Sequence, residues 1–209
     1  MGLWIKICGI TNVEDALAAL DAGADALGVN FVSSSKRLVD VAVGLAVREA
    51  VGDRAEVVAV VANRSPAELA ELRERTGIAC LQLHGNEAPD AVRAVLPQAY
   101  KAVRIATAAD VREALSIPGE RLLADAKVDG ELGGTGRAFD WTLVVELAAV
   151  RPIVLAGGLT PENVAEAVRL VRPFGVDVAS GVEAGDPRRK DPERVVRFVR
   201  AARSAGDAR

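Results

Sequence analysis

Short apolar runs alternate with longer amphipathic segments along this chain of 209 residues, and this alternation constrains its fold more than any other feature. Each run has about the length of a β-strand and consists mainly of Val, Ile, Leu and Ala. The stretch Val57–Val61 is apolar throughout, which is typical of a parallel strand covered on both faces. Eight runs are predicted to be strands: Trp4–Cys8, Ala26–Phe31, Glu56–Ala62, Ala79–Leu83, Tyr100–Ile105, Leu122–Asp125, Ile153–Ala156 and Val176–Ala179.

Helix start signals stand between several of these strands. Ser65-Pro66-Ala67-Glu68 has the form of a capping box with Pro at the first helical position. Thr11-Asn12-Val13-Glu14 also has the form of a capping box, without the proline, and is predicted to open the first helix. The last helix is predicted to begin at Asp191-Pro192-Glu193 and to run to about Arg203, which leaves Ser204–Arg209 as a frayed tail.

The order of these elements predicts the fold. Each strand candidate is followed by a helical segment, and no long linker or change of composition divides the chain, so residues 1–209 are expected to form one domain. Alternating strands and helices imply a parallel sheet with right-handed crossovers, either open and doubly wound or closed into a barrel. Eight units spaced about 25 residues apart favour closure, because an eight-stranded parallel barrel needs roughly 200 residues or more. The predicted fold is α/β, a single-domain (β/α)8 TIM barrel.

Composition and charge exclude several classes of partner. The net charge of −3 gives no basic surface, so nucleic acid is not an expected partner. No apolar stretch approaches the ~18 residues of a membrane span, and the first residues lack the layout of a signal peptide. Two cysteines do not make a disulfide framework, so both are read as reduced thiols of a cytoplasmic protein. A monomer and a homodimer both fit the sequence.

In a TIM barrel the catalytic groups lie at the carboxyl ends of the strands, and this rule reduces the candidates. Cys8 and Asp125 end the first and sixth predicted strands and are the candidates for acid–base catalysis. Taken alone, Cys8 is better read as a small buried hydrophobe. Asp125 alone fits a capping or salt-bridging role equally well. The presence of both at strand ends favours catalysis.

Glycines follow the seventh and eighth predicted strands, where TIM barrels commonly bind phosphate. Gly157 and Gly158, and the pair Ser180 and Gly181, would let backbone N–H groups approach an anion near a short helix. Such glycines can also merely turn the chain, but two motifs at both expected positions favour a small phosphorylated substrate. The segment Gly133–Gly136 is read as either a mobile lid or a loose loop.

Three further side chains are candidates for substrate binding. Arg37 is suited to a bidentate contact with a carboxylate, and its alternative is a solvated charge beside Lys36. His84 is the only histidine, and it is read as either a site residue or a satisfied hydrogen-bonding group. Asp177 lies on the eighth predicted strand. One histidine and two distant cysteines do not make a metal site, and no nucleotide fingerprint follows a strand, so neither a metal nor a cofactor is predicted.

Five segments spread over most of the chain resemble the signature segments of the phosphoribosylanthranilate isomerase family, in the family's order. The opening K-I-C-G-I-T combined with G-G-T-G and F-D-W is the most specific part of the resemblance. After Glu183 the chain departs from the short Pro-Gly-x-Lys-Asp segment that is usual in the family. The five segments are Lys6–Thr11, Gln82–Gly85, Gly133–Trp141, Leu155–Leu159 and Ser180–Glu183.

The resemblance implies a reaction and a role for each matching residue. The reaction is the Amadori rearrangement of N-(5-phosphoribosyl)anthranilate to 1-(2-carboxyphenylamino)-1-deoxyribulose 5-phosphate in tryptophan biosynthesis, without metal or cofactor. Asp125 would be the general acid that opens the sugar ring, and Cys8 the general base that removes the C2′ proton as a thiolate. Arg37 would hold the anthranilate carboxylate. The phosphate site would consist of Gly157, Gly158, Ser180 and Gly181.

Three other interpretations fit the sequence less well. A pentose-phosphate epimerase would need metal-binding histidines, and the chain has one. Indole-glycerol-phosphate synthase would need a catalytic lysine at the carboxyl end of a strand, whereas Lys101 stands near the start of the fifth predicted strand. A non-catalytic barrel that binds phosphosugars is the third, and the pairing of Cys8 with Asp125 argues against it.

Overall fold

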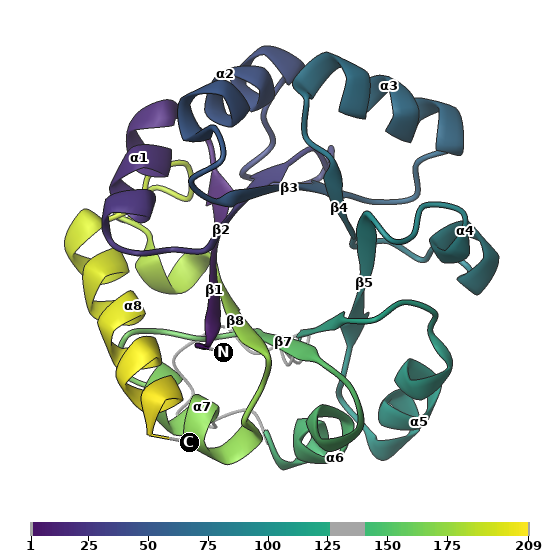
Figure 1. Ribbon diagram of the computed structural model, residues 1–209, viewed down its shortest axis with the longest axis vertical. Helices are drawn as coiled ribbons and strands as arrows, with labels where there is room; N and C mark the ends of the chain where they lie inside the picture. Colours follow the sequence, from purple (N-terminus) through teal and green to yellow (C-terminus); the bar gives the residue numbers. More distant parts are fainter. Residues whose placement is uncertain (1, 126–140, 209) are drawn as a thin grey trace.

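A closed barrel of eight parallel strands forms the centre of the molecule, as predicted (Figure 1). The structure is a computed structural model that describes residues 2–125 and 141–208. Each strand pairs with its neighbour in the sequence, and the last pairs with the first. The strands are β1 (Trp4–Ile10), β2 (Ala26–Asn30), β3 (Glu56–Val61), β4 (Cys80–Leu83), β5 (Ala99–Arg104), β6 (Leu122–Asp125), β7 (Ile153–Ala156) and β8 (Gly175–Val178).

A ring of helices surrounds the barrel (Figure 1). They are α1 (Val13–Asp21), α2 (Val41–Val51), α3 (Pro66–Thr76), α4 (Pro89–Arg93), α5 (Ala108–Ser116), α6 (Thr142–Val150), α7 (Val164–Val171), a short 3-10 helix η1 (Ser180–Val182) and α8 (Pro192–Asp207). No helix of the described ranges is both long and apolar enough to cross a membrane.

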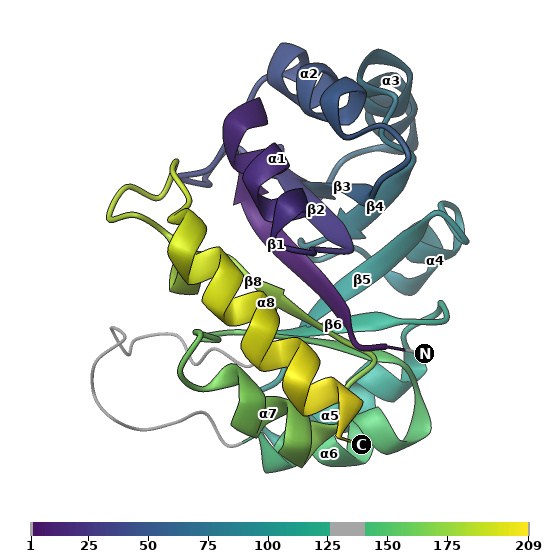
Figure 2. The same ribbon diagram turned by 60° about the vertical axis from the view of Figure 1, so that its left-hand side comes forward.

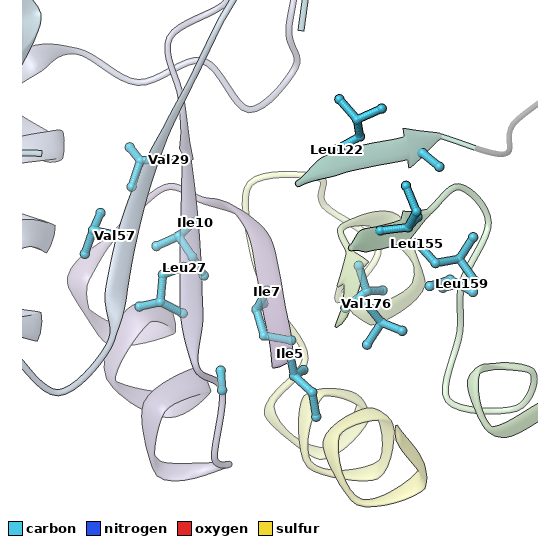
Figure 3. Packing of buried hydrophobic residues seen from close by; sticks show 14 of the residues in the cluster. Ile5, Ile7, Ile10, Leu27, Val29, Val57, Leu122, Leu155, Leu159 and Val176 are labelled. Atoms are coloured by element: carbon cyan, nitrogen blue, oxygen red, sulfur yellow. The ribbon is translucent and has the colours of Figure 1, made fainter. Parts of the chain in front are cut away.

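Two hydrophobic layers follow from the alternation of side chains along each strand. The outer layer lies between the barrel and the helices, and Figure 3 shows part of it, with Ile5 and Ile7 on β1. Because successive residues point to opposite faces, Lys6 and Cys8 face the barrel interior. The apolar part of the interior is a smaller cluster: Ala26, Val58, Tyr100, Ala102, Leu123, Val154 and Ala156.

The same alternation places polar side chains above this inner cluster. Leu123 is an inner residue, so Asp125, two positions further along β6, faces inward at the carboxyl end of the barrel. Val176 and Val178 belong to the outer layer, and Asp177 between them faces the interior. Because side chains alternate between the two faces of each strand, charged groups from several strands gather inside the barrel at its carboxyl end.

The structure corrects two local predictions. The N-cap of α1 is Asn12, whose side chain accepts a hydrogen bond from the Asp15 backbone, while the Thr11 hydroxyl donates to the carbonyl of Arg188. The tail is not frayed over its predicted length, because α8 continues to Asp207 and buries Ala205 against the core. The capping box of Ser65 and Glu68 at α3 is confirmed.

Helix α8 closes the helical ring beside the first and last strands (Figure 2). It runs back along the barrel, so the chain ends near the end of the barrel where β1 begins (Figure 2). There the Arg203 guanidinium lies 2.7 Å from the Asp25 carboxylate and also donates to the Leu3 carbonyl. The burial of Ala205 and this ion pair hold the last turns of α8 in place.

Candidate active site

A cavity of about 390 Å³ opens at the carboxyl ends of the strands. It collects side chains from β1, β4, β6 and β8 and from the loops after β2, β7 and β8. Every predicted site residue except Gly181 lines it, and Gly181 follows Ser180 in η1. The predicted residues in its wall are Cys8, Arg37, His84, Asp125, Gly157, Gly158, Asp177 and Ser180.

Cys8 and Asp125 share this cavity although 116 intervening residues separate them in the sequence. Cys8 is buried on β1, at the point where the pairing with β2 becomes irregular between Cys8 and Ile10. Asp125 is the last residue of β6 and is half-buried. A thiol and a carboxyl group therefore face the same space, as acid–base chemistry on one small molecule requires.

A buried ion pair lies beside Cys8. The ammonium Nζ of Lys6 is 2.9 Å from Asp177 Oδ1 and 2.9 Å from Gln82 Oε1. The Tyr100 hydroxyl donates to the same Gln82 oxygen over 3.0 Å. Lys6 is fully buried, so its charge depends on these partners for its solvation. Asp177, predicted to bind substrate, thus has one carboxylate oxygen engaged by Lys6.

The environment of Cys8 acts on its ionisation in two directions. Burial raises the pKa of the Cys8 thiol, because a thiolate is poorly solvated there. Attraction to Lys6 lowers that pKa, repulsion from Asp177 raises it, and Lys190 lowers it. Burial is the largest of these effects, so Cys8 rests as a thiol at neutral pH.

His84 stands at the end of β4 beside Gln82. Because Gln82 Oε1 already accepts from Lys6 and Tyr100, its amide nitrogen is the atom that faces His84 Nδ1, at 2.9 Å. An amide nitrogen only donates, so Nδ1 is the acceptor and the ring proton lies on Nε2. Burial lowers the pKa of His84, which keeps the ring neutral at pH 7.

Arg37 reaches the cavity across the end of β1. Gly9 makes room for it with a φ of +77°, and a Cβ atom at Gly9 would lie 2.2 Å from Arg37 Cδ. Arg37 Nε donates to Glu183 Oε1 at 2.5 Å, and that oxygen is also 3.5 Å from Lys190 Nζ. The interpretation of Arg37 as a solvated charge is therefore wrong, since Glu183 fixes the guanidinium at the rim.

The glycine motifs form a continuous edge of the cavity. Gly157 and Gly158 have φ values of +94° and +65°, a region that favours glycine. A Cβ atom at Gly181 would lie 2.0 Å from the Leu159 carbonyl oxygen, so the loop after β8 packs directly on the loop after β7. Backbone from both loops thus borders the place predicted for phosphate.

Sequence reasoning assigned no role to three charged residues of this site: Lys6, Glu183 and Lys190. The period of two along β1 could have indicated Lys6, since it lies on the same face as Cys8. Lys190 is buried, and its Nζ donates to the Ala179 carbonyl over 3.1 Å. Nothing comparable marks it in the sequence. The segment Gly133–Gly136 lies outside the described residues.

No group of three or more His, Cys, Asp or Glu side chains suited to a metal ion occurs within residues 2–125 and 141–208. Lys101 lies on β5 and does not line the cavity that contains Cys8. Its Nζ donates to the carbonyls of Leu83 and Gly85 and pairs with Glu87 at 3.3 Å. Its amino group nevertheless lies beyond the carboxyl end of β4, in a neighbouring cavity that His84 and Asp125 also line, so the expectation that Lys101 stands at the wrong end of the barrel is wrong for its amino group.

A TIM barrel with a thiol, a carboxyl group and an arginine around one cavity at its carboxyl end belongs to the class of acid–base barrel enzymes. Residues 5–201 match the family model described as N-(5'phosphoribosyl)anthranilate (PRA) isomerase. The chain belongs to this family.

Individual relatives agree with the family match. A curated N-(5'-phosphoribosyl)anthranilate isomerase of Magnetococcus marinus is 44% identical over 99% of this chain and 98% of its own length. The crystal structure of phosphoribosyl anthranilate isomerase from Thermotoga maritima has a TM-score of 0.88 and 36% identity, over 97% of this chain and 99% of that one. A phosphoribosyl anthranilate isomerase in complex with reduced 1-(o-carboxyphenylamino)-1-deoxyribulose 5-phosphate has a TM-score of 0.86 and 34% identity, over the same shares.

Proposed function

We propose that this chain converts N-(5-phosphoribosyl)anthranilate to 1-(2-carboxyphenylamino)-1-deoxyribulose 5-phosphate, with Cys8 as general base and Asp125 as general acid. The observation that carries the proposal is the convergence of these two side chains on the cavity that Arg37 and the glycine edge also border. Family membership supports the same reaction, and a related isomerase binds a reduced form of the product.

Substrate binding uses two groups of residues around the cavity. The phosphate lies against backbone of the loops that contain Gly157, Gly158 and Gly181, where missing side chains allow close approach. The anthranilate carboxylate binds the terminal guanidinium nitrogens of Arg37, while Glu183 holds Nε. A substrate fixed at both ends places its sugar between Cys8 and Asp125, and such positioning contributes to the rate by itself.

The reaction begins at the ring oxygen of the sugar. Asp125 gives its proton to this oxygen, the bond from the oxygen to C1′ breaks, and the nitrogen lone pair forms a C1′ iminium. Cys8 loses its thiol proton to solvent, and the resulting thiolate takes the proton from C2′. The electrons of that C–H bond form the enolamine and neutralise the nitrogen. Tautomerisation moves the hydroxyl proton from O2′ to C1′ and gives the ketone.

Formation of the iminium also favours ionisation of the Cys8 thiol. Burial disfavours the thiolate form of Cys8. A positive charge that forms at C1′, next to the carbon from which Cys8 removes a proton, favours the thiolate by direct attraction. Ring opening by Asp125 thus prepares the base as well as the substrate, and the acid step precedes the base step.

Steady-state kinetics with N-(5-phosphoribosyl)anthranilate test the proposal through a coupled anthranilate-fluorescence assay. We expect turnover, with no loss of rate in excess EDTA, because the acid step and the base step are both assigned to side chains. Absence of turnover would favour a non-catalytic phosphosugar-binding barrel instead. Turnover that depends on an added divalent metal would contradict the assigned acid–base mechanism.

A further inference from the structure

The mechanism above leaves one buried charge next to the reacting sulfur without a role. Lys6 and Cys8 lie two residues apart on β1 and face the same side. A Cβ atom at Gly28 on β2 would lie 2.7 Å from Cys8 Sγ and 3.0 Å from Lys6 Nζ, so both atoms border one small space. Attraction to the Lys6 ammonium is the largest of the interactions that lower the pKa of the Cys8 thiol.

We propose that Lys6 is the positioning residue for Cys8, whose ammonium orients the sulfur and stabilises its thiolate form. The inference rests on the proposed role of Cys8 as general base and extends it to a residue that does not contact the substrate. A thiolate needs a nearby positive charge when it is buried, since water cannot solvate it there. Lys6 supplies that charge before the substrate arrives.

The fold keeps Lys6 protonated in a position where an isolated lysine would lose its proton. Burial by itself would lower the pKa of Lys6, but attraction to Asp177, with smaller contributions from other groups, outweighs burial and raises it. Asp177 and Gln82 accept hydrogen bonds from Nζ at 2.9 Å each. The cation is thus permanent over the working range of pH, which suits a positioning role and not proton transfer.

Other charged groups around Cys8 also influence its pKa and therefore determine how much Lys6 stabilises the thiolate. Asp177 on β8 repels the thiolate, and its influence on Cys8 is smaller than that of Lys6. Lys190, which precedes α8, attracts the thiolate more weakly than Lys6. Three further titratable or charged side chains line the same cavity: Arg37, His84 and Asp125. Among the groups that act on Cys8, Lys6 is the strongest attraction.

The experiment compares the alkylation rate of Cys8 by iodoacetamide in the full-length protein and in Lys6→Met, read by peptide mapping. Loss of the neighbouring Lys6 charge should raise the pKa of the Cys8 thiol by about 1–3 units, the usual effect of an opposite charge within about 4–6 Å. Because thiolate nucleophilicity partly compensates, the rate should fall roughly 3- to 40-fold. Lys6→Arg should restore most of it. Cys80 serves as the internal reference in each sample.

Matched variants keep the result specific. Lys101→Met removes another buried, carboxylate-paired lysine away from the cavity of Cys8, and it should leave the alkylation rate of Cys8 unchanged. If Lys6→Met does not fold because Asp177 loses its partner, Lys6→Met/Asp177→Asn keeps the interior neutral. That pair should still slow alkylation, since the attraction of Lys6 exceeds the repulsion of Asp177.

A third variant separates charge from mere packing. Lys6→Gln keeps a polar side chain beside Asp177 but removes the positive charge, so alkylation of Cys8 should be about as slow as in Lys6→Met. Equal alkylation rates in wild type, Lys6→Met and the double variant would overturn the proposal, as would a wild-type alkylation rate in Lys6→Gln. These rates need no turnover, so failure here is distinguishable from failure of Cys8 as the base, which Cys8→Ser kinetics report.

Discussion

The two cysteines lie at opposite ends of the barrel with similar neighbours. At the carboxyl end, Cys8 has the cation of Lys6 and the carboxylate of Asp177 beside it. At the amino end, Cys80 begins β4, and its sulfur is 3.6 Å from a terminal nitrogen of Arg121, which in turn pairs with Glu56 at 3.0 Å. Both thiols are thus partly desolvated next to one cation and one anion.

The balance of these charges differs between the two ends. At Cys80, burial raises the pKa to about 12, and repulsion from Glu56 exceeds attraction to Arg121. At Cys8, attraction to Lys6 exceeds repulsion from Asp177. The guanidinium of Arg121 also lies over the rings of Trp4 and Tyr100, at 5.0 and 4.6 Å from their centroids, which suits a packing role. A cysteine beside a cation and an anion therefore serves packing at the amino end of the barrel, and we propose that it serves catalysis at the carboxyl end.

The largest expected difference between the ends is catalytic. Cys8→Ser and Asp125→Asn should each lower kcat at least ~10²-fold, the usual contribution of a general acid or base. Cys80→Ser should change kcat by no more than about twofold, because Cys80 does not line the cavity. Steady-state kinetics of the three variants, with thermal unfolding as a check of folding, measure this contrast. Near-normal kcat in either site variant would remove the role given to that residue.

The two arginines extend the comparison to substrate binding. Arg37→Ala removes the proposed partner of the anthranilate carboxylate, and a hydrogen bond to a charged group contributes about 1.5–3 kcal/mol. KM should therefore rise roughly 10- to 150-fold while kcat changes less. Arg121→Ala should lower the melting temperature and leave KM unchanged. Equal KM values for wild type and Arg37→Ala would place the carboxylate elsewhere.

The pattern of apolar residues within single strands and helices made most of the barrel predictable. The eight strands lie within two residues of their expected bounds, because each is a short β-branched or aliphatic run with breaks on both sides. The prediction was wrong where tertiary contacts decide. Thr11 was expected as a cap but bonds Arg188, far along the chain, and Ala205 is helical because the core covers it.

The site was predictable to the extent that strand ends identify it. Cys8 and Asp125 end strands in the sequence itself, and their meeting in one cavity follows from barrel closure. The charges that surround them were not predictable. Lys6 bonds Asp177 across 171 positions of sequence, and Arg37 bonds Glu183 across 146. No local pattern encodes such pairs, since they depend on which strands become neighbours when the barrel closes.

Two glycines with the same φ angle extend the comparison to the backbone. Gly158 in the proposed phosphate site and Gly77 after α3 both have a φ of +65°. Alanine at either position should cost about 1–2 kcal/mol of stability, the cost of a left-handed conformation for a residue with a Cβ atom. At Gly158 the methyl group should also weaken one backbone contact to phosphate, worth about 1 kcal/mol, and raise KM about fivefold.

Inhibition by inorganic phosphate provides a second test of the variants Gly158→Ala and Gly77→Ala. As a competitive inhibitor it should bind Gly158→Ala less tightly than wild type, and Gly77→Ala should bind it as wild type does. If both variants lose stability equally and neither changes KM or phosphate inhibition, the phosphate does not contact the backbone at Gly158.

The smallest expected effect concerns the single histidine, which lies only at the catalytic end. Burial lowers the pKa of His84 below its ordinary value of 6.5, so the unfolded chain binds a proton that the folded chain refuses. The free energy of unfolding should therefore fall as pH drops below about 6.5, by no more than ~1.4 kcal/mol per unit, until the folded pKa is reached. Urea unfolding of wild type and His84→Gln measures it: their difference in stability should be constant above pH 7 and shift in favour of His84→Gln below it. A difference that stays constant from pH 7.5 to 5.5 would mean that His84 titrates alike in both states, and that the polar end of the barrel is wetter than its burial indicates.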